Sequence, residues 1–193
     1  MELSYTINEN NKYYNVKEVL KEEFQISNRL LLRLKNNKKI YLNGNITSAN
    51  NNVAISDVVS VLIDFEEENS NIVPTQIPLD ILYEDEYFII INKPAKLPVH
   101  PSVLHYENSL SNGLRYYFDT KGLKKKIRPV NRLDKDTSGI VVFAKNEYIQ
   151  ECFIKQMQSK QFIKKYIAIC EGVFENQNGT INAPISRKPN SII

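Results

Sequence analysis

Residues 131–144 read Asn-Arg-Leu-Asp-Lys-Asp-Thr-Ser-Gly-Ile-Val-Val-Phe-Ala. A polar loop ending in Thr-Ser-Gly is followed at once by an apolar run, and this order predicts a loop that leads into a buried strand. Asp134 lies at the rim of that strand, two residues after Arg132. A carboxylate beside a cation stays ionised at neutral pH, so Asp134 can act as a nucleophile or a base without a metal. The plainer alternative is that Asp134 only caps a turn.

The composition is that of a globular protein, and its charge is unevenly distributed. Among the 193 residues, 42% are hydrophobic and 24% are charged, and the net charge is +3. Residues 1–72 contain 8 Lys and Arg against 10 Asp and Glu, whereas residues 115–165 contain 13 against 5. A basic stretch around a candidate catalytic loop suits a polyanion such as nucleic acid, although a solvated lysine surface would give the same count.

The cysteines and histidines lack the spacing of a metal or redox site. Cys152 and Cys170 form no such pair, and His100 and His105 have no third ligand nearby in sequence. The chain carries no pattern of a signal peptide and no apolar run of membrane length. We therefore expect a cytoplasmic protein with neither a zinc site nor a membrane partner.

The first third of the chain has the pattern of a small helical and β module. Apolar residues at helical spacing predict a helix over Val16–Phe24, and Ser27 is a typical N-cap for a second helix. On that second helix Arg29 and Arg33 are four residues apart and share a face, with Lys35 close behind. The dipeptide Asn43-Gly44 then predicts a hairpin turn.

Further elements follow along the chain. Residues 65–78 are polar and rich in proline, and this composition predicts a linker. Apolar periodicity predicts two helices, one carrying Leu110, Leu114 and Phe118 and one over Glu147–Gln158 that buries Ile149, Cys152, Phe153 and Met157. Strands are predicted at Val58–Ile63, Tyr87–Ile91, Lys164–Ile169 and Thr180–Ile185.

The pattern Arg-Leu-Asp-x-x-Thr-Ser-Gly at 132–139 resembles the catalytic motif of the RluA/RluD-type RNA pseudouridine synthases, in which a histidine stands at the position of Asn131. The segments at 83–85, 92–95 and 99–101 resemble the opening of the same catalytic domain, and residues 14–64 resemble the S4 RNA-binding module. The resemblance implies an α+β fold with a mixed, largely antiparallel sheet. It divides the chain into an S4-like module (14–64), a linker (65–78) and part of the catalytic domain (79–193).

The resemblance also implies roles for individual residues. Asp134 would act on a flipped-out uridine, either by attacking C1′ or by removing a ribose proton. Arg132 would fill the space left by the base, and Tyr166 would stack on the uracil and help remove the C5 proton. Arg132 could instead pair with Asp134 or a phosphate, and Tyr166 could be an ordinary core aromatic. The expected RNA contacts are Arg29, Arg33, Lys35, Lys164 and Lys165, and no metal or cofactor is implied.

The family resemblance sets expectations for the partner and for the end of the chain. Ribosomal RNA is the commonest target of members with an S4 module, transfer RNA is the alternative, and the protein is expected to be a monomer. Members of the family continue well beyond the position of Ile193. We therefore expect this chain to be a truncated member that converts uridine poorly by itself.

Two functions of other classes fit parts of the sequence. A non-catalytic RNA-binding protein would need only the S4-like module and the basic surface. A magnesium phosphohydrolase of the haloacid dehalogenase type would use Asp134-Lys135-Asp136 as its signature. In that class the first aspartate follows a buried apolar strand, whereas Asp134 follows the polar residues 128–132. The phosphohydrolase is therefore the weakest of the three hypotheses.

Overall fold

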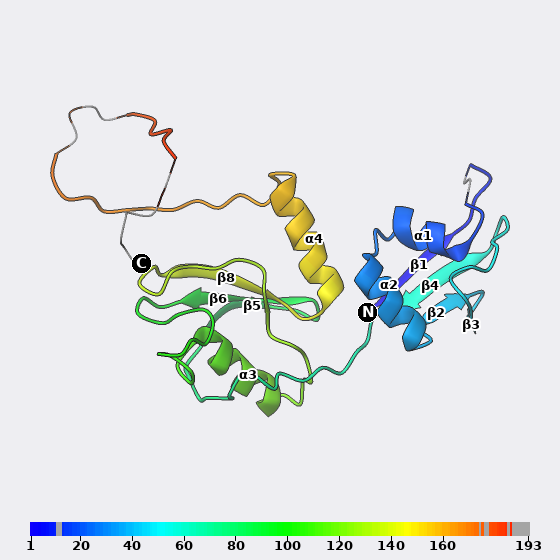
Figure 1. The fold of residues 1–193 in the computed structure, drawn as a ribbon, viewed down its shortest axis with the longest axis horizontal. Coiled ribbons are helices and arrows are strands. Elements are labelled where there is room, and N and C mark those ends of the chain that lie inside the picture. Colours follow the sequence, from blue (N-terminus) through cyan, green and yellow to red (C-terminus); the bar gives the residue numbers. More distant parts are fainter. Residues whose placement is uncertain (11–12, 174, 176–177, 185, 187–193) are drawn as a thin grey trace. The chain divides into compact units, whose positions relative to one another are not determined.

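The computed structural model describes residues 1–10, 13–173, 175, 178–184 and 186. The chain divides into two units, Met1–Phe162 and Ile163–Ile193. The first unit contains two four-stranded sheets, both antiparallel, each packed against helices (Figure 1). The predicted α+β class is therefore confirmed. Within the described residues, no helix has both the length and the apolar character needed to cross a lipid bilayer.

The first sheet has the strand order β1-β4-β2-β3. Its elements are β1 (Glu2–Thr6), α1 (Val16–Glu22), α2 (Asn28–Asn36), β2 (Ile40–Leu42), β3 (Asn45–Ile46) and β4 (Val58–Leu62). Both helices, the Ser27 cap and the hairpin agree with the prediction. The Ser27 side chain accepts a hydrogen bond from the Leu30 amide at 3.2 Å. Asn43 and Gly44 both have positive φ, at 51° and 77°, as a two-residue hairpin turn requires.

The apolar face of α2 fixes how its basic residues are presented. Leu30, Leu31 and Leu34 are buried against Val59 and Val61 of β4. Burial of a leucine side chain contributes about 1.5–3 kcal/mol, so these three residues together anchor the helix firmly. The polar side of α2 is left facing away from this core.

The second sheet has the order β5-β6-β8-β7 and carries the Asp134 loop. Its elements are β5 (Asp80–Glu84), β6 (Phe88–Lys93), α3 (Leu110–Thr120), β7 (Arg128–Pro129), β8 (Gly139–Ala144) and α4 (Glu147–Gln158). The predicted helices and the predicted strand around Tyr87–Ile91 are confirmed, with the strand beginning one residue later. The apolar run after Gly139 is the inner strand β8, as its sequence indicates.

Side chains alternate across β6 and β8, so the sheet has two apolar faces. One face packs on α3. The sheet contributes Ile89, Ile91, Val141 and Phe143 to this core, and α3 contributes Leu110, Leu114 and Phe118. The other face packs on α4 through Phe88, Ile90, Val142, Ala144, Ile149, Phe153 and Met157. The α4 side chains predicted to be buried are only half-buried. They cover one side of a sheet, and the opposite side of the helix faces away from it.

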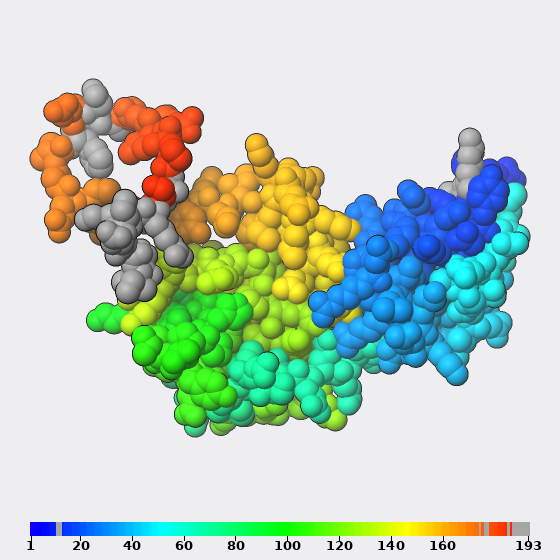
Figure 2. All heavy atoms as spheres, viewed as in Figure 1, coloured from blue at the N-terminus to red at the C-terminus, as the bar shows by residue number. Residues whose placement is uncertain are grey.

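Helix α4 also contacts the core of the first sheet and its helices. The space-filling view shows its yellow atoms against the blue ones (Figure 2). Tyr148 packs against the core of the first sheet. The Lys155 ammonium donates a hydrogen bond to the Gln25 carbonyl at 2.8 Å. Side chains of α4, which packs on the second sheet, therefore contact residues of the first sheet and its helices.

Residues 65–78 form neither helix nor strand, yet they are held against their neighbours. Asn69 is buried, and its side chain donates to the Lys125 carbonyl at 2.9 Å and accepts from the Ile127 amide at 2.8 Å. The segment lies inside the unit Met1–Phe162. Its assignment as a linker between domains at 14–64 and 79–193 stays a prediction.

The predicted strand at Lys164–Ile169 is wrong for this structure. These residues form no strand, and the Ile167 and Ile169 side chains are fully exposed. A strand needs a neighbour for its backbone hydrogen bonds, and the described residues pair none with this segment. The prediction for Thr180–Ile185 is also not met over 180–184, and Ile185 lies outside the described residues.

Candidate active site

The Asp134 loop connects β7 to β8, and its four charged residues are all exposed to solvent, namely Arg132, Asp134, Lys135 and Asp136. The Thr137 amide donates to the Asp134 carbonyl at 3.2 Å and closes a turn directly after the carboxylate. The described part of Met1–Phe162 therefore leaves the Asp134 carboxylate accessible and does not enclose it.

The Asn131 side chain binds the loop to β8 in the manner of a strand residue. Its amide nitrogen donates to the Ile140 carbonyl at 2.9 Å, and its oxygen accepts from the Val142 amide at 2.9 Å. A primary amide offers one donor group and one acceptor, as a peptide unit does, so it continues the ladder beyond the two-residue strand β7. The loop therefore starts from a fixed point.

A buried lysine supports the loop from below. Lys93 has no exposed surface, and its ammonium donates to the carbonyls of Lys135 (2.9 Å), Pro94 (2.8 Å) and Leu97 (2.8 Å). Burial lowers the pKa of Lys93, and the charges of Asp136 and Asp134 oppose that shift. A buried ammonium with three carbonyl acceptors is satisfied, so Lys93 links the end of β6 to the residue after Asp134.

Gly139 is the first residue of β8, and it is paired with Lys93 of β6 in the strand register. Its φ is +124°, in a region that favours glycine, and a Cβ there would meet only the Leu133 side chain at 3.9 Å. The glycine of the Thr-Ser-Gly turn is therefore required by the backbone rather than by lack of space.

His100 lies close enough to Arg132 to feel its charge. The pKa of His100 is lowered by burial, and the positive charge of Arg132 adds to that effect. His100 is therefore neutral at pH 7 and can both donate and accept a hydrogen bond. The spacing of the histidines indicated no zinc site, and neither His100 nor Lys93 was predicted as a site residue.

The predicted RNA contacts on α2 differ in their surroundings. Arg29 and Lys35 are exposed. Arg33 instead donates to Glu67 at 2.6 Å and to Glu147 at 2.9 Å, and its guanidinium carbon lies 4.0 Å from the centre of the Phe65 ring. The Arg33 guanidinium therefore links α2 to Glu67 and to Glu147 of α4.

Glu67 joins Arg33 to the second sheet. It accepts two hydrogen bonds from Arg128, at 2.6 and 2.7 Å, in addition to the one from Arg33. Burial alone would raise the pKa of Glu67, but the hydrogen bonds from the two arginines outweigh burial and lower it. The carboxylate is therefore ionised and bridges α2 to the strand that precedes the Asp134 loop.

Tyr166, Lys164 and Lys165 belong to the unit Ile163–Ile193, whereas Arg132 and Asp134 belong to Met1–Phe162. All three are exposed. The predicted stacking of Tyr166 on the uracil and the predicted RNA contacts of the two lysines stay predictions.

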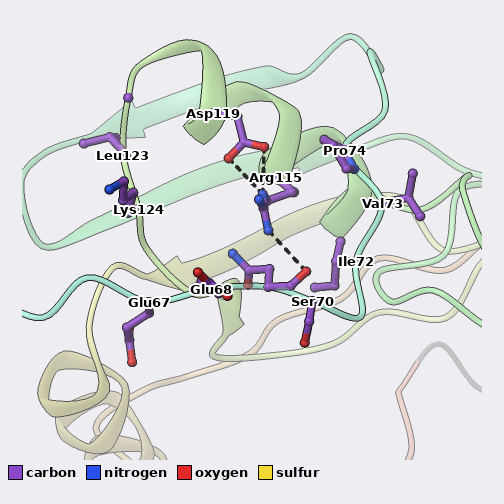
Figure 3. A pocket seen from close by; sticks show the side chains of 12 residues that line it. Glu67, Glu68, Ser70, Ile72, Val73, Pro74, Arg115, Asp119, Leu123 and Lys124 are labelled. Atoms are coloured by element: carbon purple, nitrogen blue, oxygen red, sulfur yellow. Dashed lines mark hydrogen bonds and ion pairs between the residues drawn. The ribbon is translucent and has the colours of Figure 1, made fainter.

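A hollow of about 620 Å³ lies elsewhere, between residues 67–74 and α3 (Figure 3). Arg115 crosses it, donating to the Asp119 carboxylate at 2.8 Å and to the Asn69 carbonyl at 3.2 Å. These contacts bind residues 65–78 to α3. In the part of the chain that the structure describes, no group of three or more His, Cys, Asp or Glu side chains could hold a metal ion.

Comparison with known proteins identifies the family of this loop and its sheet. The profile of the RNA pseudouridylate synthases matches residues 87–192, more than half of the chain. The chain therefore belongs to the RNA pseudouridylate synthase family. A second profile, that of the N-terminal domain of RluD ribosomal pseudouridine synthase, matches residues 3–59 and includes β1.

Three relatives show the extent of the similarity. The uncharacterized RNA pseudouridine synthase YhcT of Bacillus subtilis is 36% identical over 96% of this chain and 61% of its own length. Ribosomal large subunit pseudouridine synthase D of Borreliella burgdorferi is 36% identical over 86% of this chain and 49% of its own. The Escherichia coli K12 protein of that name is 33% identical over 98% and 58%. The chain thus spans about half to three-fifths of these relatives.

Proposed function

We propose that this chain acts in an RNA pseudouridine synthase that isomerises specific uridines in RNA, with Asp134 as the catalytic residue. The observation that carries the proposal is the Asp134 loop. The loop that bears this exposed carboxylate is bound to β8 by the Asn131 side chain and to β6 by buried Lys93, which donates to the Lys135 carbonyl, and it lies inside the range that matches the family. A reactive side chain on a supported loop is what a site for a macromolecular substrate requires.

The reaction is an isomerisation, so the nucleoside loses and gains nothing overall. The bond from C1′ to N1 of uracil breaks, a bond from C1′ to C5 forms, the C5 proton leaves and N1 takes up a proton. Asp134 would begin this sequence as an ionised carboxylate, either at C1′ or at a ribose proton. The chemistry needs no metal, nucleotide or redox cofactor.

Arg132 and Tyr166 are proposed to handle the extruded base. Arg132 is exposed two residues from Asp134, and a planar cation there could stack in the gap that the flipped uridine leaves. Flipping costs a few kcal/mol of stacking, which such contacts would partly offset. Tyr166 is proposed to stack on the uracil and to assist removal of its C5 proton.

RNA affinity is proposed to come from cations on both sides of the loop. Arg29 and Lys35 on α2 are exposed, as are Lys164 and Lys165 beyond α4. Arg33 is proposed to contribute indirectly, because it already binds Glu67 and Glu147. The proposed organisation is an S4-like module (14–64), a linker (65–78) and a catalytic part (79–193).

Ribosomal RNA is the proposed target, because relatives at 33–36% identity are named for the large ribosomal subunit. Transfer RNA is the alternative. We further propose that the protein acts as a monomer in the cytoplasm, where ribosomal RNA is found in bacteria.

The decisive test maps pseudouridine across total RNA from cells in which the gene encoding this chain is deleted. The intact gene should restore one or a few sites, and the same gene with Asp134→Asn should restore none. Asp134→Asn should also leave RNA affinity within about twofold in a binding assay, since the carboxylate is not a phosphate contact. Arg132→Lys is a useful companion, because it keeps the charge and removes the planar guanidinium.

A pseudouridine map that deletion of the gene leaves unchanged, or lost sites that the Asp134→Asn gene restores, would refute the proposal. A protein that binds RNA tightly while the pseudouridine map stays unchanged would instead be the non-catalytic RNA-binding protein.

A further inference from the structure

A second hollow, of about 480 Å³, lies between α2, residues 126–129 and α4. The side chains that matter for its chemistry are those of Arg29, His100, Lys126, Pro129, Glu151 and Ile154. It shares no lining residue with the hollow of Figure 3. We call it the α2–α4 groove.

The groove carries positive charge that the described residues do not neutralise. Arg29 and Lys126 are exposed, and no ion pair engages either of them in the described part of the chain. The other buried charges at the groove are already matched, Arg128 with Glu67 and Glu147 with Arg33. Among the described residues that line the groove, Glu151 is the one carboxylate without an ion pair, and it opposes the charge of the two cations.

The walls of the groove are held in place by contacts across it. The Gln150 amide donates to the Pro129 carbonyl at 3.1 Å and ties α4 to the strand β7. Arg33 bridges Glu67 and Glu147 and ties α2 to α4. Cations on fixed walls bind an anion without the cost of ordering flexible loops.

His100 connects the groove to the Asp134 loop. It lines the groove, and it is near enough to Arg132 for that charge to lower its pKa. The wall residues 126–129 also lead along the chain directly into the Asp134 loop, so the groove adjoins that loop. Pro129 and Ile154, which is 39% exposed, add apolar surface suited to the faces of a ribose or a base.

We propose that the α2–α4 groove binds the backbone of the single-stranded RNA segment adjoining the uridine that Asp134 receives, with Arg29 and Lys126 contacting successive phosphates. This proposal rests on the proposed function and adds to it a path for the substrate. An acidic peptide would find the same cations, but the neutral imidazole and the apolar floor favour a nucleotide chain over a run of carboxylates.

The test is equilibrium binding of the 193-residue chain to a fluorescein-labelled, uridine-rich 12-nucleotide RNA at several salt concentrations. Arg29→Ala with Lys126→Ala should weaken binding at least tenfold. The double variant should also lower the slope of log Kd against log salt by about 1.4, since each phosphate contact on a single strand accounts for about 0.7. Lys17→Ala, an exposed lysine of α1 outside the groove, is the matched control and should change affinity less than twofold.

A loss of affinity could also arise from misfolding, so the test includes a variant that is expected to gain affinity for RNA. Glu151→Gln removes the unmatched carboxylate and should tighten RNA binding two- to threefold, which an unfolded protein cannot do. The proposal that the groove binds RNA would be refuted if the Arg29, Lys126 and Lys17 substitutions had equal effects on affinity. It would also be refuted if the Glu151→Gln variant bound RNA no better than the unchanged protein. A weaker Arg29 and Lys126 variant together with a pseudouridine map independent of Asp134 would keep the groove and reject the proposed enzyme.

Discussion

Replacing Glu67 with alanine should destabilise the protein by about 3 kcal/mol at pH 7. The Glu67 and Arg128 side chains are 10% and 8% exposed, and Glu67 accepts both of the short hydrogen bonds that Arg128 makes. Without Glu67, Arg128 keeps only a 3.4 Å contact to the Lys126 carbonyl, while Arg33 keeps Glu147. Removing one member of a buried pair costs about 3–5 kcal/mol, and the partial rescue of Arg33 favours the lower end.

The assay is urea unfolding followed by circular dichroism at pH 7, pH 4 and pH 3. The matched control is Glu66→Ala, because Glu66 and its partner Lys124 are 78% and 69% exposed and such surface pairs contribute at most about 1 kcal/mol. For a chain of this length, the Glu67→Ala loss corresponds to a fall in Tm of about 6–12 °C.

Acid should reduce the difference in free energy of unfolding between the wild-type protein and the Glu67→Ala variant. The pKa of Glu67 is lowered in the folded protein, so its stabilisation is present above the ordinary value of 4.5 and is lost as the pH falls further. A Glu67→Ala variant as stable as Glu66→Ala at pH 7 would contradict the reasoning. So would a difference that stays constant down to pH 3.

Three further predictions concern Lys93 beside the Asp134 loop, His100 near Arg132, and Gly113 in α3. Lys93→Met should cost about 2 kcal/mol in urea unfolding and abolish Asp134-dependent conversion, because three carbonyls lose their shared donor. Arg132→Ala should raise the pKa of His100 toward 6.5, measured by NMR titration, because a nearby positive charge is removed. An unchanged His100 pKa would mean that the two residues lie too far apart to interact. Gly113→Ala should destabilise the fold by about 1–3 kcal/mol, because a Cβ there would lie 3.0 Å from the Ile77 side chain.

Local signals predicted the elements that depend on local interactions. The Ser27 cap, the Asn43-Gly44 hairpin and the helix over Glu147–Gln158 were all found where the sequence indicates them. Each is specified by residues within a few positions of one another. The loop before β8 was predictable for the same reason, since Gly139 and the apolar run that follows act on adjacent residues.

Features that depend on distant partners were not predictable in this way. Strand β1 has a weak pattern and forms because β4 pairs with it, for example Tyr5 with Val59. Arg33 was expected to face RNA, but the sequence does not reveal that Glu67 and Glu147 lie beside it. Lys93 lies in the segment 92–95 that was noted only for its family resemblance, and only the tertiary fold brings its buried ammonium to the carbonyl of residue 135.

The amide of Asn131 makes the base of the loop insensitive to acid. An amide carries no proton that is gained or lost in the physiological range, so its bonds to Ile140 and Val142 persist as the solution is acidified. An imidazole in that position would gain a second N–H near pH 6.5 and could no longer accept from the Val142 amide. With asparagine at this position, these two hydrogen bonds are therefore kept in mildly acidic surroundings, where a histidine at the same position would lose the second of them.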